Sequence, residues 1–161
     1  MFYVELFAAL QREKVRYLVV GGLAVNLHGV QRLTMDVDLV LALDQTNIGR
    51  FRRAAERLSL EPVQPVSIKD LGDPAKTASW ISEKGMLALA LRSPEKTAPT
   101  VDVLVKPAIG FEDAYARRVE MSVGELTVAV ASIDDIIALK TGTGRLKDRA
   151  DIEALGKIRE R

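Results

Sequence analysis

Two aspartates in an otherwise apolar segment constrain the fold of this chain most strongly. Residues 36–43, DVDLVLAL, have the alternation and apolar content of a β-strand. Alternate residues of a strand point to the same side, so Asp36 and Asp38 place two carboxylates on one face, roughly 7 Å apart between Cα atoms. Burying unpaired carboxylates is costly, so a buried pair requires a cation, and Mg²⁺ favours oxygen ligands. The same pair also fits a strand end that faces water.

A third carboxylate interrupts another apolar segment. Asp102 lies in TVDVLV, which also has the composition of a strand. If that strand lies beside residues 36–43, three carboxylates converge, and three carboxylates can hold two metal ions. One ion would activate an attacking hydroxyl, and the other would hold a triphosphate and its leaving group. Taken alone, Asp102 equally fits the surface of a half-buried strand.

Two glycines, Gly21 and Gly22, follow the apolar strand expected at residues 16–20 and precede a short helix expected at residues 23–28. Glycine allows the backbone to approach a ligand closely, and helix N-termini offer free N–H groups to phosphate. The pair also fits a simple tight turn. The spacing is neither that of a dinucleotide-binding G-x-G-x-x-G loop nor that of a Walker A loop.

The remaining pattern predicts an α/β (α+β) fold in which a mixed β-sheet is flanked by helices. The predicted helices cover residues 2–14, 45–58, 110–118, 133–141 and 147–161, and the predicted hairpins pair residues 86–91 with 100–105 and 119–123 with 126–130. Residues 61–80 predict only a strand piece, a loop and a helical turn near Lys76. Because strands and helices do not alternate regularly, the pattern argues against a doubly wound parallel sheet. We expect a single domain over residues 1–161, with residues 132–161 as a C-terminal helical section.

The composition narrows the cellular context. The formal net charge is +1, so no global field attracts nucleic acid or anionic membrane. The chain has no cysteine, which excludes disulfides, zinc–thiolate sites and thiol catalysis. The N-terminal residues have the wrong charge order for a signal peptide, and no apolar run approaches a membrane span. We therefore expect a cytoplasmic protein without a membrane partner.

The glycines and aspartates together resemble a known signature. An apolar strand, Gly-Gly, 13 residues and Asp-x-Asp resemble the DNA polymerase β-like nucleotidyltransferase superfamily. The whole string is similar to that of small bacterial nucleotidyltransferases of toxin–antitoxin and abortive-infection systems, whose pattern is G-G-x-A-x-x-x-H-G-x-x-R-x-T-x-D-x-D. The matching positions are Gly21, Gly22, Ala24, His28, Gly29, Arg32, Thr34, Asp36 and Asp38. Residues 60–98 carry no motif of this kind.

The resemblance implies a nucleotidyltransferase fold and a role for each matched residue. Gly21 and Gly22 would hold the triphosphate of ATP or another NTP. Asp36 and Asp38 would bind magnesium, two ions in all, and Asp102 would be both a metal ligand and the general base. The superfamily often has Gly-Ser instead of Gly-Gly, so one hydroxyl contact to phosphate is missing here.

Three further residues are candidates for nucleotide binding. Arg32 either pairs with the aspartates or contacts phosphate, and Thr34 either bonds a phosphate or shapes the entry to the strand. Lys140, or Lys147, grips the triphosphate if the C-terminal section folds over the cleft. Otherwise these C-terminal charges form a solvated face. The single histidine, His28, fits a structural role better than a catalytic one.

The function predicted from the sequence is the metal-dependent transfer of a nucleoside monophosphate from an NTP to a hydroxyl, with release of pyrophosphate. The acceptor is an RNA such as tRNA, a protein or a small molecule. The alternative is a catalytically inactive module of a toxin–antitoxin-like pair that binds a nucleotide or a cognate partner protein. In a third possibility, the carboxylates hold only a structural ion.

Overall fold

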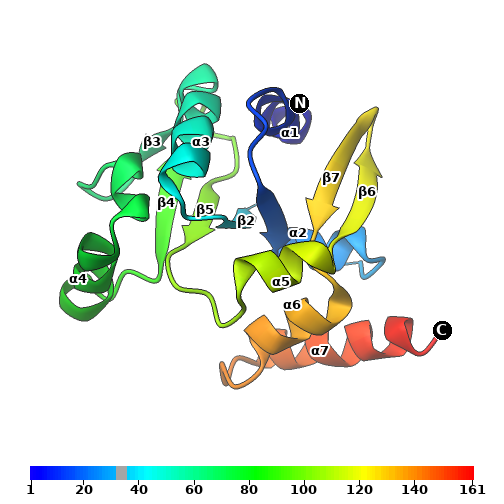
Figure 1. The fold of residues 1–161 in the computed structure, drawn as a ribbon. Coiled ribbons are helices and arrows are strands. Elements are labelled where there is room, and N and C mark those ends of the chain that lie inside the picture. Colours follow the sequence, from blue (N-terminus) through cyan, green and yellow to red (C-terminus); the bar gives the residue numbers. More distant parts are fainter. Residues whose placement is uncertain (32–35) are drawn as a thin grey trace.

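The strands form one mixed sheet in the order β3-β4-β5-β2-β1-β7-β6 (Figure 1), in a computed structural model that describes residues 1–31 and 36–161. The strands are β1 (Tyr17–Val20), β2 (Val37–Leu41), β3 (Glu61–Pro62), β4 (Ala88–Arg92), β5 (Val101–Leu104), β6 (Val119–Val123) and β7 (Leu126–Val130). The helices are α1 (Phe2–Arg12), α2 (Gly21–Leu27), α3 (Gln45–Arg57), the 3-10 helix η1 (Ile68–Gly72), α4 (Pro74–Lys84), α5 (Phe111–Ala116), α6 (Ile133–Lys140) and α7 (Leu146–Arg159).

The pairing of the strands confirms the predicted mixed sheet. β1 runs antiparallel to β2, whereas β2 runs parallel to β5 and β1 runs parallel to β7. Both predicted hairpins form, since β4 pairs antiparallel with β5 and β6 with β7. The sheet therefore places β2, which carries Asp38, between β1 and β5.

The helices begin where the sequence provides caps. The Asp44 carboxylate accepts the N–H of Asn47 at 2.9 Å at the start of α3, and Ser132 Oγ accepts the N–H of Asp135 at 3.1 Å at the start of α6. The prediction for residues 61–80 was wrong in one respect, because an 11-residue helix, α4, replaces the single turn expected near Lys76. Asp73 caps this helix by accepting hydrogen bonds from the N–H groups of Ala75 and Lys76. Pro74 is the first residue of the helix, a position where the missing N–H of proline costs nothing.

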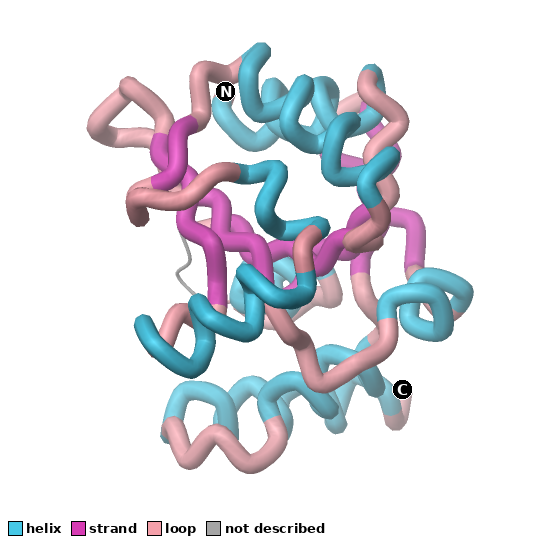
Figure 2. Tube along the Cα trace, turned by 60° about the vertical axis from the view of Figure 1, so that its left-hand side comes forward, coloured by secondary structure: helices cyan, strands magenta, loops and turns pink. Residues whose placement is uncertain are grey.

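The sheet lies between helices on opposite sides, as Figure 2 shows. Helices α1 and α3 pack against each other on one side, and α6 and α7 pack together at the other end, below α5 in Figure 1. The core contains the odd-numbered side chains of the central strands, which include Val37, Leu39, Leu89, Val101 and Val103. No helix among the described residues is long and apolar enough to cross a membrane.

A buried asparagine links the start of α3 to the two central strands. The Asn47 amide donates to the carbonyls of Arg16 and Ala42 at 2.9 and 2.8 Å, and its Oδ1 accepts the N–H of Arg16 at 2.8 Å. Arg16 precedes β1 and Ala42 follows β2. Asn47 is only 2% exposed, so it satisfies backbone groups that water does not reach.

We predict that Asn47→Leu lowers the free energy of unfolding by about 3 kcal/mol, because it leaves buried N–H and C=O groups without partners. Urea titration followed by circular dichroism measures the change. Thr46→Ala, at the exposed neighbouring position, is the control and should change stability by less than about 0.5 kcal/mol. Equal effects of the two substitutions would contradict this role of Asn47.

Candidate active site

Asp38 and Asp102 lie directly opposite each other on neighbouring strands. The parallel pairing of β2 with β5 places Asp38 beside Asp102, with Val37 beside Val101 and Leu39 beside Val103. Adjacent strands are about 4.8 Å apart, so two side chains at the same level of the sheet point to the same face. The structure thus brings together two of the predicted carboxylates, both of them half-buried.

The proximity of the carboxylates changes their protonation. Burial, together with the neighbouring charges of Asp102 and Asp36, raises the pKa of Asp38 to about 6. Burial and the charge of Asp36 also raise the pKa of Asp102. The carboxyl groups of Asp38 and Asp102 are close enough to share a hydrogen bond, which partly offsets this rise in Asp102. The charge of Asp102 therefore makes ionisation of Asp38 less favourable, whereas the hydrogen bond with Asp38 favours the ionised form of Asp102.

Asp36 lies at the edge of this pair. It precedes β2, is exposed, and its Oδ1 accepts the N–H of Thr100 at 3.4 Å. In the part of the chain that the structure describes, no three His, Cys, Asp or Glu side chains are already arranged as a set of metal ligands. The chemistry of the donors nevertheless fits Mg²⁺, because carboxylate oxygens converge where their mutual repulsion is not yet neutralised.

Gly21 contacts the Asp38 carboxylate. Val20 lies opposite Asp38 in the antiparallel pair of β1 and β2, so the chain leaves β1 beside that side chain. Gly21 has a φ of +68°, and a Cβ at this position would lie 2.0 Å from Asp38 Oδ2. Only glycine fits both the backbone angle and the space. Helix α2 begins at Gly21 itself, two residues earlier than predicted, so both glycines belong to its first turn.

A cleft of about 380 Å³ opens in front of these residues. Its floor contains the end of β1, the two glycines and Asp38, one wall comes from α6 and α7, and Leu87 and Leu104 belong to the side of β4 and β5. The full lining is Val20, Gly21, Gly22, Asp38, Leu87, Leu104, Ile136, Leu139, Lys140, Arg145, Lys147 and Asp148. The C-terminal section therefore faces the cleft. No pattern in the sequence selects Leu87, and the only signal for Leu104 is its position two residues after Asp102.

Lys140 faces the cleft but is already paired. Its ammonium contacts Asp148 Oδ1 at 3.1 Å and Asp151 Oδ2 at 3.0 Å, and its side chain is 10% exposed. The buried Asp148 carboxylate also accepts hydrogen bonds from Thr143 Oγ at 2.7 Å and binds Arg145 Nε at 2.9 Å. The positive charges of Lys140 and Lys147 lower the pKa of Asp38, opposing the effect of its burial. The charges of residues 140–151 thus form a partly buried network beside the cleft.

Two other predicted contacts, Arg32 and Thr34, lie outside the described residues. His28 has a structural contact, because its Nε2 lies 2.8 Å from the Ala131 carbonyl and joins the end of α2 to the residue after β7. Trp80 and Tyr17 are buried in the core.

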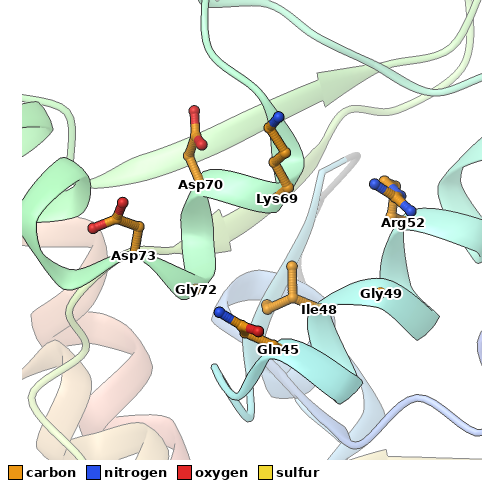
Figure 3. A pocket seen from close by; sticks show the side chains of 8 residues that line it. All are labelled: Gln45, Ile48, Gly49, Arg52, Lys69, Asp70, Gly72 and Asp73. Atoms are coloured by element: carbon orange, nitrogen blue, oxygen red, sulfur yellow. The ribbon is translucent and has the colours of Figure 1, made fainter.

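A second hollow, of about 340 Å³, lies between α3 and η1 and contains none of the candidate residues. Figure 3 shows Asp70 and Asp73 on one side of it and Arg52 on the other. Asp70 binds Lys76 at 3.0 Å, and Asp73 caps α4. Since both carboxylates have structural roles, the cleft beside Asp38 remains the candidate site.

Comparisons with known proteins agree with this geometry. A family model described as nucleotidyltransferase of unknown function (DUF6036) matches residues 4–160. The crystal structure of the lincomycin-bound lincosamide antibiotic adenylyltransferase LnuA is similar, with a TM-score of 0.63, 17% identity, and coverage of 98% of this chain and 94% of that one. The crystal structure of ANT(2'')-Ia in complex with adenylyl-2''-tobramycin has a TM-score of 0.59 and 13% identity, and the match covers 99% of this chain and 93% of that one.

Two further matches are more distant or shorter. A nucleotidyltransferase-like protein from Paracoccidioides brasiliensis has a TM-score of 0.57 and 20% identity, covering 97% of this chain and 73% of that one. An 8-amino-7-oxononanoate synthase of Pseudomonas syringae pv. tomato is 33% identical over 73 residues, which are 42% of this chain and 18% of that protein. The chain thus spans less than a fifth of this last relative, and the local match carries no argument about activity.

We predict that Gly21→Ala lowers the free energy of unfolding by about 3 kcal/mol and abolishes nucleotide transfer, because the methyl group displaces Asp38 and the backbone angle is unfavourable. Gly124→Ala is a matched control, since Gly124 has a φ of +61° but open space around its Cβ position. The free energy of unfolding of Gly124→Ala should fall by only about 1 kcal/mol, and this variant should retain activity. Thermal unfolding and a transfer assay measure both. Activity of Gly21→Ala equal to that of the control would exclude the Asp38 contact as the reason for this glycine.

The raised pKa of Asp38 predicts that the free energy of unfolding depends on pH. Its pKa in the folded protein, about 6, exceeds the ordinary value of 3.8, so the folded state binds its proton more tightly than the unfolded state. Without divalent cations, this group therefore stabilises the fold at low pH, and its contribution is lost as the pH rises from about 4 to about 6.

We predict that Asp38→Asn removes this slope and raises stability at pH 7 by about 1–2 kcal/mol, while abolishing metal binding. Urea titrations between pH 4 and 7.5 in EDTA measure the slope. Asp113→Asn, an exposed carboxyl on α5, serves as the control and should retain it. A variant less stable than the wild type at pH 7 would contradict the repulsion described above.

Proposed function

The chain belongs to the DUF6036 family of nucleotidyltransferases, and on that premise we propose that it transfers a nucleoside monophosphate from an NTP to a hydroxyl acceptor in a magnesium-dependent reaction. The observation that carries this proposal is the register of β2 and β5. It places Asp38 and Asp102 side by side, next to a cleft lined by glycine backbone and cations. Carboxylates for a metal and cations for phosphates are the two requirements of this chemistry.

In this proposal the triphosphate lies between Gly21-Gly22 and the wall of α6 and α7. The first turn of α2 presents backbone N–H groups with no side chain at Gly21 or Gly22 to block their approach. Arg145 and Lys147 are exposed on the opposite wall, and Lys140 adds positive charge behind them. We assign Arg32 and Thr34 the role of additional contacts, on the sequence pattern alone.

Asp36, Asp38 and Asp102 would hold magnesium, two ions in the full assignment. When bound, the metal supplies Lewis-acid stabilisation of the charge on the reacting phosphates. Asp36 would first leave the N–H of Thr100, a weak contact that an exposed side chain exchanges readily. Asp38 lies on β2 against Gly21, whereas Asp36 precedes that strand.

Asp102 is the proposed general base. The oxygen of the acceptor hydroxyl forms a bond with the α-phosphorus, and its proton passes to the Asp102 carboxylate. The bond from the α-phosphorus to the oxygen that bridges to the β-phosphate breaks, so pyrophosphate leaves. The raised pKa of Asp102 favours this role, because a more basic carboxylate accepts a proton more readily.

The acceptor class is the part of the function that is open to direct test. The names of two structural neighbours describe adenylyl transfer involving a lincosamide and tobramycin, which are small molecules with hydroxyl groups. On this analogy we place hydroxyl-bearing small molecules first, ahead of tRNA and protein. The near-neutral net charge is consistent with this order, since large nucleic acids usually bind to strongly basic surfaces.

The test is transfer from labelled NTPs in magnesium to three acceptor pools: an aminoglycoside and lincosamide panel, total tRNA and cell lysate protein. We predict that Asp102→Asn lowers kcat by about 100-fold or more, because it removes both the proposed base and a proposed metal ligand. Asp36→Ala with Asp38→Ala should abolish transfer. Asp113→Ala is the matched carboxyl control and should retain wild-type activity.

Two outcomes would overturn the proposal. Transfer that survives the double substitution would remove the metal assignment. Failure of the wild-type protein to bind any NTP or Mg²⁺ in calorimetry would favour the alternative, a partner-binding module of a toxin–antitoxin-like pair.

A further inference from the structure

One side of the cleft is aliphatic. Leu104 lies two residues after Asp102 on β5, so it shares the sheet face of that carboxylate and is half-buried. Leu87 precedes β4, beside the Ala88 that pairs with Leu104. Both leucines line the cleft, and both approach it from β4 and β5, not from the helices.

Leu87 is held at the cleft although its side chain is 70% exposed. Its carbonyl accepts the N–H of Val105 at 3.0 Å, which extends the pairing of β4 with β5 by one position. A large aliphatic side chain fixed at the rim of a cavity and left uncovered is available for contact with a ligand. Leu146 is 80% exposed but does not line the cleft, so exposure alone does not define this position.

The charged groups of the cleft lie on other elements. Its cations come from α6 and α7, and its carboxylate, Asp38, comes from β2. Lys140 is paired with Asp148 and Asp151, and Arg145 is paired with Asp148, while the side chains of Arg145 and Lys147 are exposed to solvent. A ligand that fills this cavity therefore meets charge on one side and hydrocarbon on the other.

An NTP has this division, because its triphosphate is charged and the faces of its base are apolar. A cavity of about 380 Å³ is within the usual range for small ligands, roughly 300–1,000 Å³. With the triphosphate against the glycines and cations, the base is the part that meets the leucines. This assignment rests on the proposed function.

We propose that Leu87 and Leu104 hold the nucleobase by apolar contact, so that the site binds purine and pyrimidine triphosphates with similar affinity. Strong discrimination between bases requires polar groups that are left unpaired when the wrong base binds. Leucine side chains have no hydrogen-bonding atoms, so they distinguish bases only by contact area. Leu87 is thus a specificity-determining residue that makes the enzyme permissive.

The test is calorimetric titration of the whole chain with ATP, GTP, CTP and UTP in magnesium without acceptor, alongside inorganic tripolyphosphate as a probe without a base. We expect the four dissociation constants to lie within about threefold of each other. Leu87→Ala should weaken all four NTPs about fivefold through lost apolar contact, while tripolyphosphate binding stays unchanged. Leu87→Met, which retains apolar volume, should restore NTP affinity.

Leu146→Ala is the matched control, because it removes an equally exposed leucine outside the cleft, and it should bind all probes as the wild type does. The inference is overturned if one NTP binds the wild type more than tenfold tighter than the others. It is also overturned if Leu87→Ala leaves NTP affinity unchanged or weakens tripolyphosphate equally. If the wild type binds neither NTP nor tripolyphosphate, the proposed function fails as well, which separates that result from failure of the base assignment alone.

Discussion

Two carboxylates lie at the same level of adjacent strands, and the candidate site depends on this register. Asp38 and Asp102 are half-buried, and burial and their neighbours raise the pKa of both. The surrounding β-strands are rigid and well packed, so the side chains cannot separate by moving the backbone. A sequence optimised only for stability would have an amide or an apolar residue at positions 38 and 102. The stored repulsion is the physical reason to assign a cation to this place.

The same pair determines the backbone around it. The antiparallel pairing of β1 with β2 brings Val20 opposite Asp38, so the next residue, Gly21, passes against that carboxylate. A side chain there would occupy the position of an Asp38 oxygen. The glycine therefore has two functions at once, since it makes space for the carboxylate and exposes backbone N–H groups at the start of α2. Asn47 secures the outer ends of β1 and β2, at Arg16 and Ala42.

Several charged residues of the C-terminal helices α6 and α7 are partly buried and paired with one another. Residues such as Lys140 and Asp148 belong to a sequence of alternating charges that is usually a solvated face. In the folded chain, Lys140 binds Asp148 and Asp151, Arg145 also binds Asp148, and these ion pairs join α6 to α7. Arg145, a further partner of Asp148, and Lys147 also line the cleft, together with the leucines Leu87 and Leu104.

The sequence by itself determined the mixed α/β fold and both hairpins, because strand alternation and capping are local properties. Its motif also selected Gly21, Asp36, Asp38 and Asp102 as candidate site residues, although Asp36 precedes β2, whereas the sequence pattern placed it within the strand. Only the tertiary structure decided that β5 pairs in parallel with β2, which sets Asp102 beside Asp38, because pairing between residues 64 positions apart leaves no local pattern. The length of α4, the pairing of Lys140 and the selection of Leu87 were likewise decided by packing, since each depends on which distant residues approach it.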